Sequence, residues 1–145
     1  MRFIVAFSLF LLATQDVSTA VAEDWRSINP DVIYGHKAGM ALTYDVVRPT
    51  KDANGAAVLF MVSGGWVSTW GPPENFIRAE KDSLNLFEKI VERGYTLVLV
   101  RHGSSPYFKV PDAVADVKLS IRHIRAHAAD LSKQCTTLMR PANWS

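Results

Sequence analysis

Residues 56–66 read Ala-Ala-Val-Leu-Phe-Met-Val-Ser-Gly-Gly-Trp, an apolar run that leads directly into two glycines and a tryptophan. An uninterrupted run without charge is typical of a strand buried on both faces of a sheet. Residues 96–100, Thr-Leu-Val-Leu-Val, form a second run of this kind. The segment between the two runs has the apolar spacing of a helix. The sequence therefore predicts a strand–helix–strand unit, which implies parallel strands.

Two further strands are expected upstream of this unit. Residues 32–34 are apolar and residues 40–47 are rich in β-forming side chains. The stretch 35–39 has a glycine at each end and predicts the turn between them. A polar turn at 51–55, Lys-Asp-Ala-Asn-Gly, then leads into the third strand.

Helices are expected on either side of the strand at 96–100. The first covers 74–93 and stops at Gly94. The second is capped by Asp112 and ends near Asp130, with apolar residues repeating at three and four positions. The predicted order is strand, strand, strand, helix, strand, helix. This is an α/β fold with an incomplete sheet.

Composition limits the classes of protein to consider. The chain has 145 residues, 48% of them hydrophobic and 21% charged, which suits one globular domain. Its net charge of +2 implies no strong attraction to nucleic acid or anionic lipid. Cys135 is the single cysteine, so no internal disulfide can form.

Residues 1–22 have the pattern of a signal peptide. Arg2 precedes an apolar run at 3–13, and Ala-Val-Ala at 20–22 is a small-residue cleavage site. The run is too short to cross a bilayer, which needs about 20 residues. The alternative is a buried N-terminal helix or strand. We expect a secreted or periplasmic protein whose mature chain begins at Glu23, with no membrane span after cleavage.

The glycines after the third strand have two interpretations. Gly64 and Gly65 permit a close backbone approach to a ligand, and paired backbone N–H groups form the oxyanion hole of acyl-transfer enzymes. The other interpretation is a plain Gly-Gly turn. The tetrapeptide Ser-Gly-Gly-Trp alone favours the plain turn.

The wider sequence around this turn is similar to a known family. Val62-Ser63-Gly64-Gly65-Trp66 aligns with the His-Gly-Gly-Gly-Trp motif that follows the third strand of α/β-hydrolase esterases. Val62 replaces the family's His, and Ser63 replaces its first Gly. The likeness continues over roughly 31–131 and is greatest to secreted esterase- and lipase-like proteins grouped with bacterial feruloyl esterase domains. It implies that Gly64 and Gly65 form the oxyanion hole for a small-molecule ester.

The catalytic part of this family's motif set is missing. The fold places its nucleophilic Ser on a G-x-S-x-G elbow, and no such pattern occurs in the sequence, whose last glycine is Gly103. We therefore assign 23–131 to the N-terminal half of a hydrolase domain and 132–145 to a divergent tail. The expectation is a truncated, inactive chain of esterase lineage with no triad residues and no cofactor. A complete small α/β domain of another kind and a non-catalytic remnant are the alternatives.

Arg101-His102-Gly103 offers a different enzymatic interpretation. The tripeptide follows a buried strand and resembles the signature of histidine phosphatases, in which His is phosphorylated and Arg binds phosphate. Under the esterase interpretation, the same residues lie at the carboxyl end of a strand, where α/β ligand sites form. Trp66, His102 and Ser104 are then expected to line a pocket.

Two further sets of residues each have two interpretations. His123 and His127 are four residues apart and share a helix face, an arrangement that can bind zinc. The sequence lacks the H-E-x-x-H pattern, and the neighbouring Lys118, Arg122 and Arg125 favour a solvated basic face. No metal site is therefore predicted. Trp66 and Trp70 are expected either to stack on an aromatic substrate or to pack under the loop.

Overall fold

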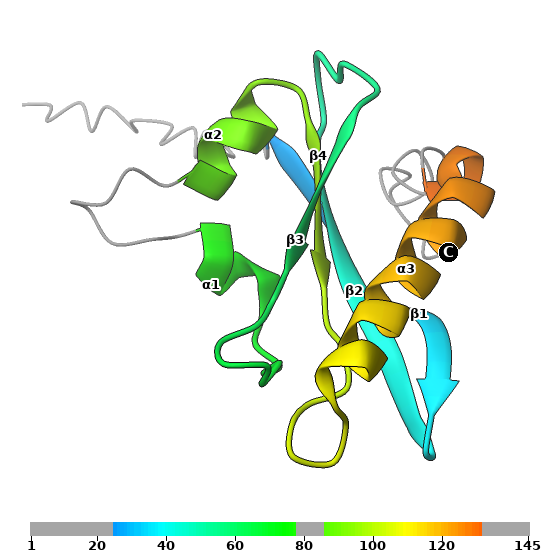
Figure 1. The fold of residues 1–145 in the computed structure, drawn as a ribbon. Helices are drawn as coiled ribbons and strands as arrows, with labels where there is room; N and C mark the ends of the chain where they lie inside the picture. The colour runs from blue at the N-terminus through cyan, green and yellow to red at the C-terminus, as the bar shows by residue number, and fades with distance from the viewer. Residues whose placement is uncertain (1–24, 78–85, 132–145) are drawn as a thin grey trace, which may run out of the picture.

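The computed structural model describes residues 25–77 and 86–131 (Figure 1). Within them, four strands form one sheet in the order β1-β2-β4-β3. Its strands are β1 (Arg26–Lys37), β2 (Met40–Pro49), β3 (Ala57–Met61) and β4 (Thr96–Val100). β2 is antiparallel to both of its neighbours, whereas β3 and β4 are parallel, as predicted. The predicted signal peptide at 1–22 and the divergent tail at 132–145 lie outside the described residues.

The first hairpin is longer than predicted. β1 continues through the segment expected to be a turn, and the chain reverses only at Ala38 and Gly39, which both have positive φ. Register shifts in the pairing with β2 absorb the irregular stretch of β1 around Asp31 and Gly35. A Cβ on Gly35 would lie 2.9 Å from the side chain of Leu119, so the missing side chain lets a helix pack closely on this strand.

The two predicted central strands differ in burial. Leu97, Val98, Leu99 and Val100 of β4 are all buried, as expected for a strand with neighbours on both sides. The prediction that the other strand is buried on both faces is wrong for β3, whose Leu59, Phe60 and Met61 are each more than a third exposed. The reason is position, because among the described residues β3 pairs only with β4 and forms an edge of the sheet.

Helices cover both faces of the sheet (Figure 1). On one face lie α1 (Pro73–Ile77) and α2 (Leu86–Glu92), which lie in the region of the predicted helix 74–93, with α1 beginning one residue earlier. Residues 78–85 of that prediction lie outside the described part. On the other face lies α3 (Val110–Ala126). Each face has its own apolar core, one around Tyr44 and Val98 beneath α3 and the other around Leu97 and Val91 beneath α1 and α2.

The ends of α3 correct the predicted boundaries. The N-cap is Lys109, and Asp112 is the third residue of the helix, where its carboxylate accepts the Lys109 N–H at 2.9 Å. Asp112 therefore supplies the carboxylate half of a capping box from the third helical position instead of serving as the N-cap. At the other end His127 is the C-cap, and 128–131 form a separate helical turn, so α3 ends earlier than the predicted Asp130. None of the described helices is long and apolar enough to span a membrane.

Gly94, the predicted helix stop, provides a test of this packing. Its φ is +87°, and an added Cβ would lie 2.4 Å from the backbone oxygen of Asp52. Gly39 has a similar φ of +80° with nothing within 4 Å. We expect Gly39→Ala to lower the free energy of unfolding by about 1–2 kcal/mol, because alanine is disfavoured in a left-handed backbone conformation. Gly94→Ala should lower it by about 1–3 kcal/mol more, because the added Cβ also clashes with Asp52. Urea unfolding of both variants measures this, and equal losses would contradict the described contact.

Candidate functional site

The loops that follow β3 and β4 meet at one edge of the sheet, because parallel strands end on the same side. Backbone and side-chain hydrogen bonds join them. The Ser105 N–H donates to the Trp66 carbonyl at 3.0 Å, and the Ser68 N–H donates to the Ser104 hydroxyl at 2.9 Å. The same hydroxyl donates back to the Ser68 carbonyl at 3.1 Å. The two loops therefore form one connected surface.

The Gly-Gly-Trp turn has a defined conformation. Gly64 and Val67 exchange two backbone hydrogen bonds, of 2.9 and 3.0 Å. Between them, Gly65 and Trp66 have φ of 58° and 67°. Both central residues thus have positive φ, which is the sign pattern of a type I′ turn. Trp66 is a non-glycine residue with positive φ, so it carries backbone strain, whereas Ser63, which replaces the family's first Gly, does not have positive φ.

The two glycines predicted to form the oxyanion hole differ in whether their backbone N–H groups are hydrogen-bonded. The Gly64 N–H is engaged by the Val67 carbonyl. Within the described residues the Gly65 N–H donates no hydrogen bond. Neither glycine's Cβ position has an atom within 4 Å, so the space beside both is open. The turn therefore presents one free N–H, and the second becomes free only when the Gly64–Val67 pair separates.

A pocket of about 550 Å³ lies between these loops and the β1–β2 hairpin. Of the three residues predicted to line a pocket, His102 and Ser104 do so, whereas Trp66 is not in the lining and is 42% exposed. The aromatic side chains of Trp70 and Tyr107 also line this pocket. Hydrophobic walls with a few convergent polar groups are the usual form of a small-molecule site.

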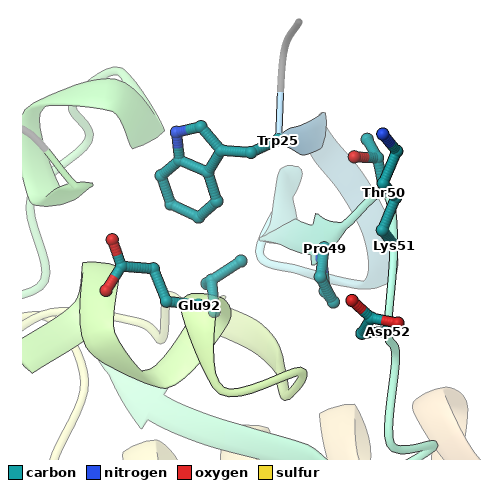
Figure 2. A pocket seen from close by; sticks show the side chains of 7 residues that line it. Trp25, Pro49, Thr50, Lys51, Asp52 and Glu92 are labelled. Carbon is teal, nitrogen blue, oxygen red and sulfur yellow. The ribbon is translucent and has the colours of Figure 1, made fainter.

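A second pocket, of about 360 Å³, lies at the opposite end of the strands (Figure 2). Its lining includes the indole of Trp25, Pro49 at the end of β2, and Glu92 at the end of α2. It contains none of the residues that the sequence singled out. The pocket at the carboxyl ends of β3 and β4 is therefore the candidate functional site.

Arg101 is a structural residue at the base of this site. It is buried and forms a two-pronged ion pair with Asp45, which has no exposed surface, with Nη1 donating to Oδ1 at 3.0 Å. Its Nη2 also donates to the carbonyl of Gly71 at 3.0 Å. The Asp31 N–H donates to the same Asp45 carboxylate at 2.9 Å. The guanidinium thereby fixes the loop after β3 to the first hairpin.

The histidine phosphatase interpretation is not supported by this geometry. A phosphatase needs an arginine free to bind phosphate, whereas the guanidinium of Arg101 is already paired with a carboxylate. It also needs an accessible histidine nucleophile. His102 is 4% exposed, its Nδ1 lies 2.8 Å from the Gly103 carbonyl, and its buried Nε2 has no partner among the described residues.

Asp116 holds the other face of the same loop. It is buried on α3, accepts the Gly103 N–H at 3.0 Å and forms an ion pair with Lys37 at 2.7 Å. Burial, and secondarily the negative charge of Asp116, raises the pKa of Tyr34 far above its usual range. The Tyr34 hydroxyl therefore stays protonated and donates to the Arg101 carbonyl.

The sequence analysis overlooked Asp45 and Asp116. The local pattern does not mark either one, because Asp45 falls at a polar position in the alternation of β2 and Asp116 lies outside the apolar repeat Val114, Val117, Ile121 and Ile124. Asp45 lies within the strand Leu42–Val47, and Asp116 lies between Ala113 and Ser120 on the buried face of α3. A charge at such a position requires a buried partner.

The predicted solvated basic face of α3 is only partly correct. Lys118, Arg122 and Arg125 are exposed. His123 is half-buried, lies 3.1 Å from the Tyr44 hydroxyl through Nδ1, and stacks on His127. Burial and His127 together lower the pKa of His123. In the part of the chain that the structure covers, no three His, Cys, Asp or Glu side chains are grouped to hold a metal ion.

Comparison with known proteins identifies the lineage. Residues 44–139, more than half of the chain, match the BD-FAE family of esterase-like α/β-hydrolase domains. The chain belongs to the BD-FAE family. The predicted resemblance, the α/β-hydrolase fold and a carboxylic-ester hydrolase lineage are thereby confirmed.

Solved esterases share the fold over most of this BD-FAE chain. A thermophilic esterase from the Planctomycetes species Thermogutta terrifontis is 28% identical, with a TM-score of 0.52 over 74% of this chain and 36% of its own. A truncated carbohydrate esterase from gut microbiota is 22% identical, with a TM-score of 0.55 over 76% and 37%. The chain thus spans little more than a third of these esterases. A comparison with curated proteins gave no match.

The ion pair below the candidate site leads to a stability prediction. Arg101→Met leaves the Asp45 carboxylate buried without its partner, so we expect a loss of about 3–5 kcal/mol. The matched control is Asp31→Asn, since Asp31 is half exposed and lies 3.6 Å from the same guanidinium. That change is expected to cost less than about 1 kcal/mol. Urea unfolding compares the two variants.

A second control separates lost pairing from lost packing. Adding Asp45→Leu to Arg101→Met removes the unpaired charge and is expected to recover much of the stability. If Arg101→Met alone were as stable as Asp31→Asn, the buried pair would not have the described role.

Proposed function

We propose that the described residues form the oxyanion side of a carboxylic-ester hydrolase site, and that the 145-residue chain alone does not hydrolyse esters through a serine triad. The observation that carries the first part is the joined loop surface after β3 and β4, on which the free Gly65 N–H lies in the same turn as Gly64. Membership of the BD-FAE family supports it.

The chemistry assigned to this surface is the stabilisation of negative charge. When an ester carbonyl is attacked, its oxygen becomes negatively charged, and backbone N–H groups about 3 Å away lower the energy of that state. Gly65 supplies one such donor, and Gly64 supplies a second once its bond to Val67 is released. Ser104 in the pocket between these loops and the β1–β2 hairpin provides a polar contact for the ester, and Trp70 provides an apolar wall.

The second part of the proposal rests on the sequence. Serine-triad hydrolysis by this fold needs a Ser on a G-x-S-x-G turn, and none of the 145 residues lies in such a pattern. The oxyanion donors alone bind and polarise an ester without supplying a nucleophile. Ester binding and ester turnover are therefore separable in this chain.

Phenyl acetate tests both parts in one sample. We expect its addition to the ¹⁵N-labelled chain to shift the amide resonance of Gly65, while that of Gly55, in the turn before β3, stays unchanged. The ester's own proton signals should decay only at the rate in buffer. An unmoved Gly65 resonance would contradict the oxyanion assignment. Phenol release above the buffer rate would contradict the proposed inactivity.

We also propose that residues 1–22 direct export and are then removed. Expressed with its own N-terminus in a bacterium, the protein recovered outside the cytoplasm is expected to begin at Glu23, as intact-mass measurement would reveal. Ala22→Leu enlarges the small residue before the cleavage site and should leave the leader attached. Recovery of the wild-type chain inside the cytoplasm with all 145 residues would overturn export.

A further inference from the structure

We propose that five exposed apolar side chains at the carboxyl edge of the sheet form a docking site for a zwitterionic lipid surface. These side chains, which we call the apolar rim, are Met40, Trp66, Val67, Trp70 and Tyr107. All five are more than a third exposed, and the exposed fraction reaches 66% for Trp70 and 91% for Tyr107. Exposed apolar groups gathered in one region mark a site that contacts another surface.

The apolar rim comes from three segments that lie at the same end of the molecule. Met40 begins β2 beside the hairpin turn, Trp66, Val67 and Trp70 follow β3, and Tyr107 follows β4 (Figure 1). The backbone hydrogen bond to the Trp66 carbonyl joins the last two segments. Met40, Trp70 and Tyr107 line the candidate pocket. Three of the five side chains therefore border one opening, and the other two lie in the loop beside it.

The two loops that carry most of the apolar rim contain no formally charged residue. Neither 62–72 nor 102–108 contains Asp, Glu, Lys or Arg, although 21% of the chain is charged. The exposed Lys109 follows directly after the second loop. Binding at an interface then depends on the apolar area that is buried more than on attraction to anionic headgroups. A zwitterionic lipid surface is therefore the partner whose charge matches the rim.

Polar groups beside the rim already have partners within the protein. The indole N–H of Trp70 donates to the Asp31 carboxylate at 3.1 Å, and the Arg101 guanidinium lies 3.6 Å from the same carboxylate. Ser68 and Ser104 are joined by two hydrogen bonds, of 2.9 and 3.1 Å. Removing polar groups from water costs much less when they keep their hydrogen bonds. The rim can therefore be covered by lipid without leaving these groups unpaired.

The shape of the rim favours a fluid partner over a rigid one. Tyr107 is almost fully exposed, so a protein partner would need a matching cavity for its ring, whereas lipid headgroups rearrange around it. Trp and Tyr are also enriched at membrane–water interfaces, because each joins an apolar ring to a polar atom. The pocket of about 550 Å³ opens beside Trp70 and Tyr107. Docking needs no oxyanion donor, so it is independent of the proposed ester chemistry.

Paramagnetic broadening of amide resonances in the ¹⁵N-labelled 145-residue chain tests the proposal. Phosphatidylcholine bicelles that contain a spin-labelled lipid are added to the protein. We expect the resonances of Gly65 and Tyr107 to broaden. Those of Gly55 and Tyr95, which precede β3 and β4 at the opposite end of the two strands, should stay sharp. Contact through the apolar run at 3–13 would not select the Gly65 end of the molecule.

Matched tyrosine variants show whether the rim side chains make the contact. Tyr107→Ser removes the most exposed ring and should weaken phosphatidylcholine binding about 10-fold, because the ring no longer buries apolar area in the interface. The affinity is measured from the broadening of Gly65 against lipid concentration. Tyr95→Ser removes an exposed tyrosine at the opposite end and should leave the affinity unchanged.

Three results with phosphatidylcholine would overturn the proposal: no broadening of Gly65, broadening of Gly55 as strong as that of Gly65, or a Tyr107→Ser variant that binds as tightly as wild type. Two further results would assign the rim to another partner and also overturn it. Broadening of Gly65 that grows with protein concentration without lipid would identify a second copy of the chain. Binding that requires anionic phosphatidylglycerol and disappears in high salt would identify an electrostatic contact.

Discussion

The buried ion pair between Arg101 and Asp45 is the interaction on which the carboxyl edge of the sheet depends. Taking two charges out of water costs several kcal/mol each, and their attraction offsets this only when the remaining polar atoms are also satisfied. Asp45 accepts a backbone N–H as well, and Arg101 donates to the Gly71 carbonyl, whereas the buried Arg101 Nε has no partner among the described residues. The pair joins β2, the end of β4 and the loop after β3. A hydrophobic substitute of the same volume could fill the space but could not specify where the loop sits.

The sequence predicted the fold where side-chain pattern determines structure. β4 and β2 match their expected positions because each is strongly apolar or regularly alternating. β1 was underestimated because Asn29-Pro30-Asp31 breaks its alternation, and only the pairing with β2 shows that a register shift absorbs the break. The predicted burial of β3 failed for a different reason. An apolar run indicates that a strand is compatible with burial, but whether it is buried depends on neighbouring elements from other parts of the chain.

The sequence predicted where the candidate site lies, but not the role of each residue in it. The rule that parallel strands end at one edge brought Gly65, His102 and Ser104 into the same region, and they lie there. Their roles could not be predicted, because hydrogen bonds within the turn and between loops distant in sequence decide them. The bond from Gly64 to Val67 and the pairing of Arg101 with a strand carboxylate leave no trace in the local pattern. The contacts of α3 were equally unpredictable, because the sequence predicted a solvated face where His123 and His127 stack on each other.

Opening the turn that contains Gly65 would involve two opposing energetic contributions. Separating the Gly64–Val67 pair gives up two backbone hydrogen bonds, each with a net value of about 0.5–1.5 kcal/mol. It also releases the positive φ of Trp66, which costs a non-glycine residue roughly 1–2 kcal/mol. On these values, opening the turn would cost at most about 2 kcal/mol. In the proposed site, an N–H bond to a charged oxygen, at about 1.5–3 kcal/mol, is enough to select the open form. Because that charge appears only as the ester carbonyl is attacked, the second donor would strengthen binding of the transition state more than binding of the ester, which is the condition for raising a rate.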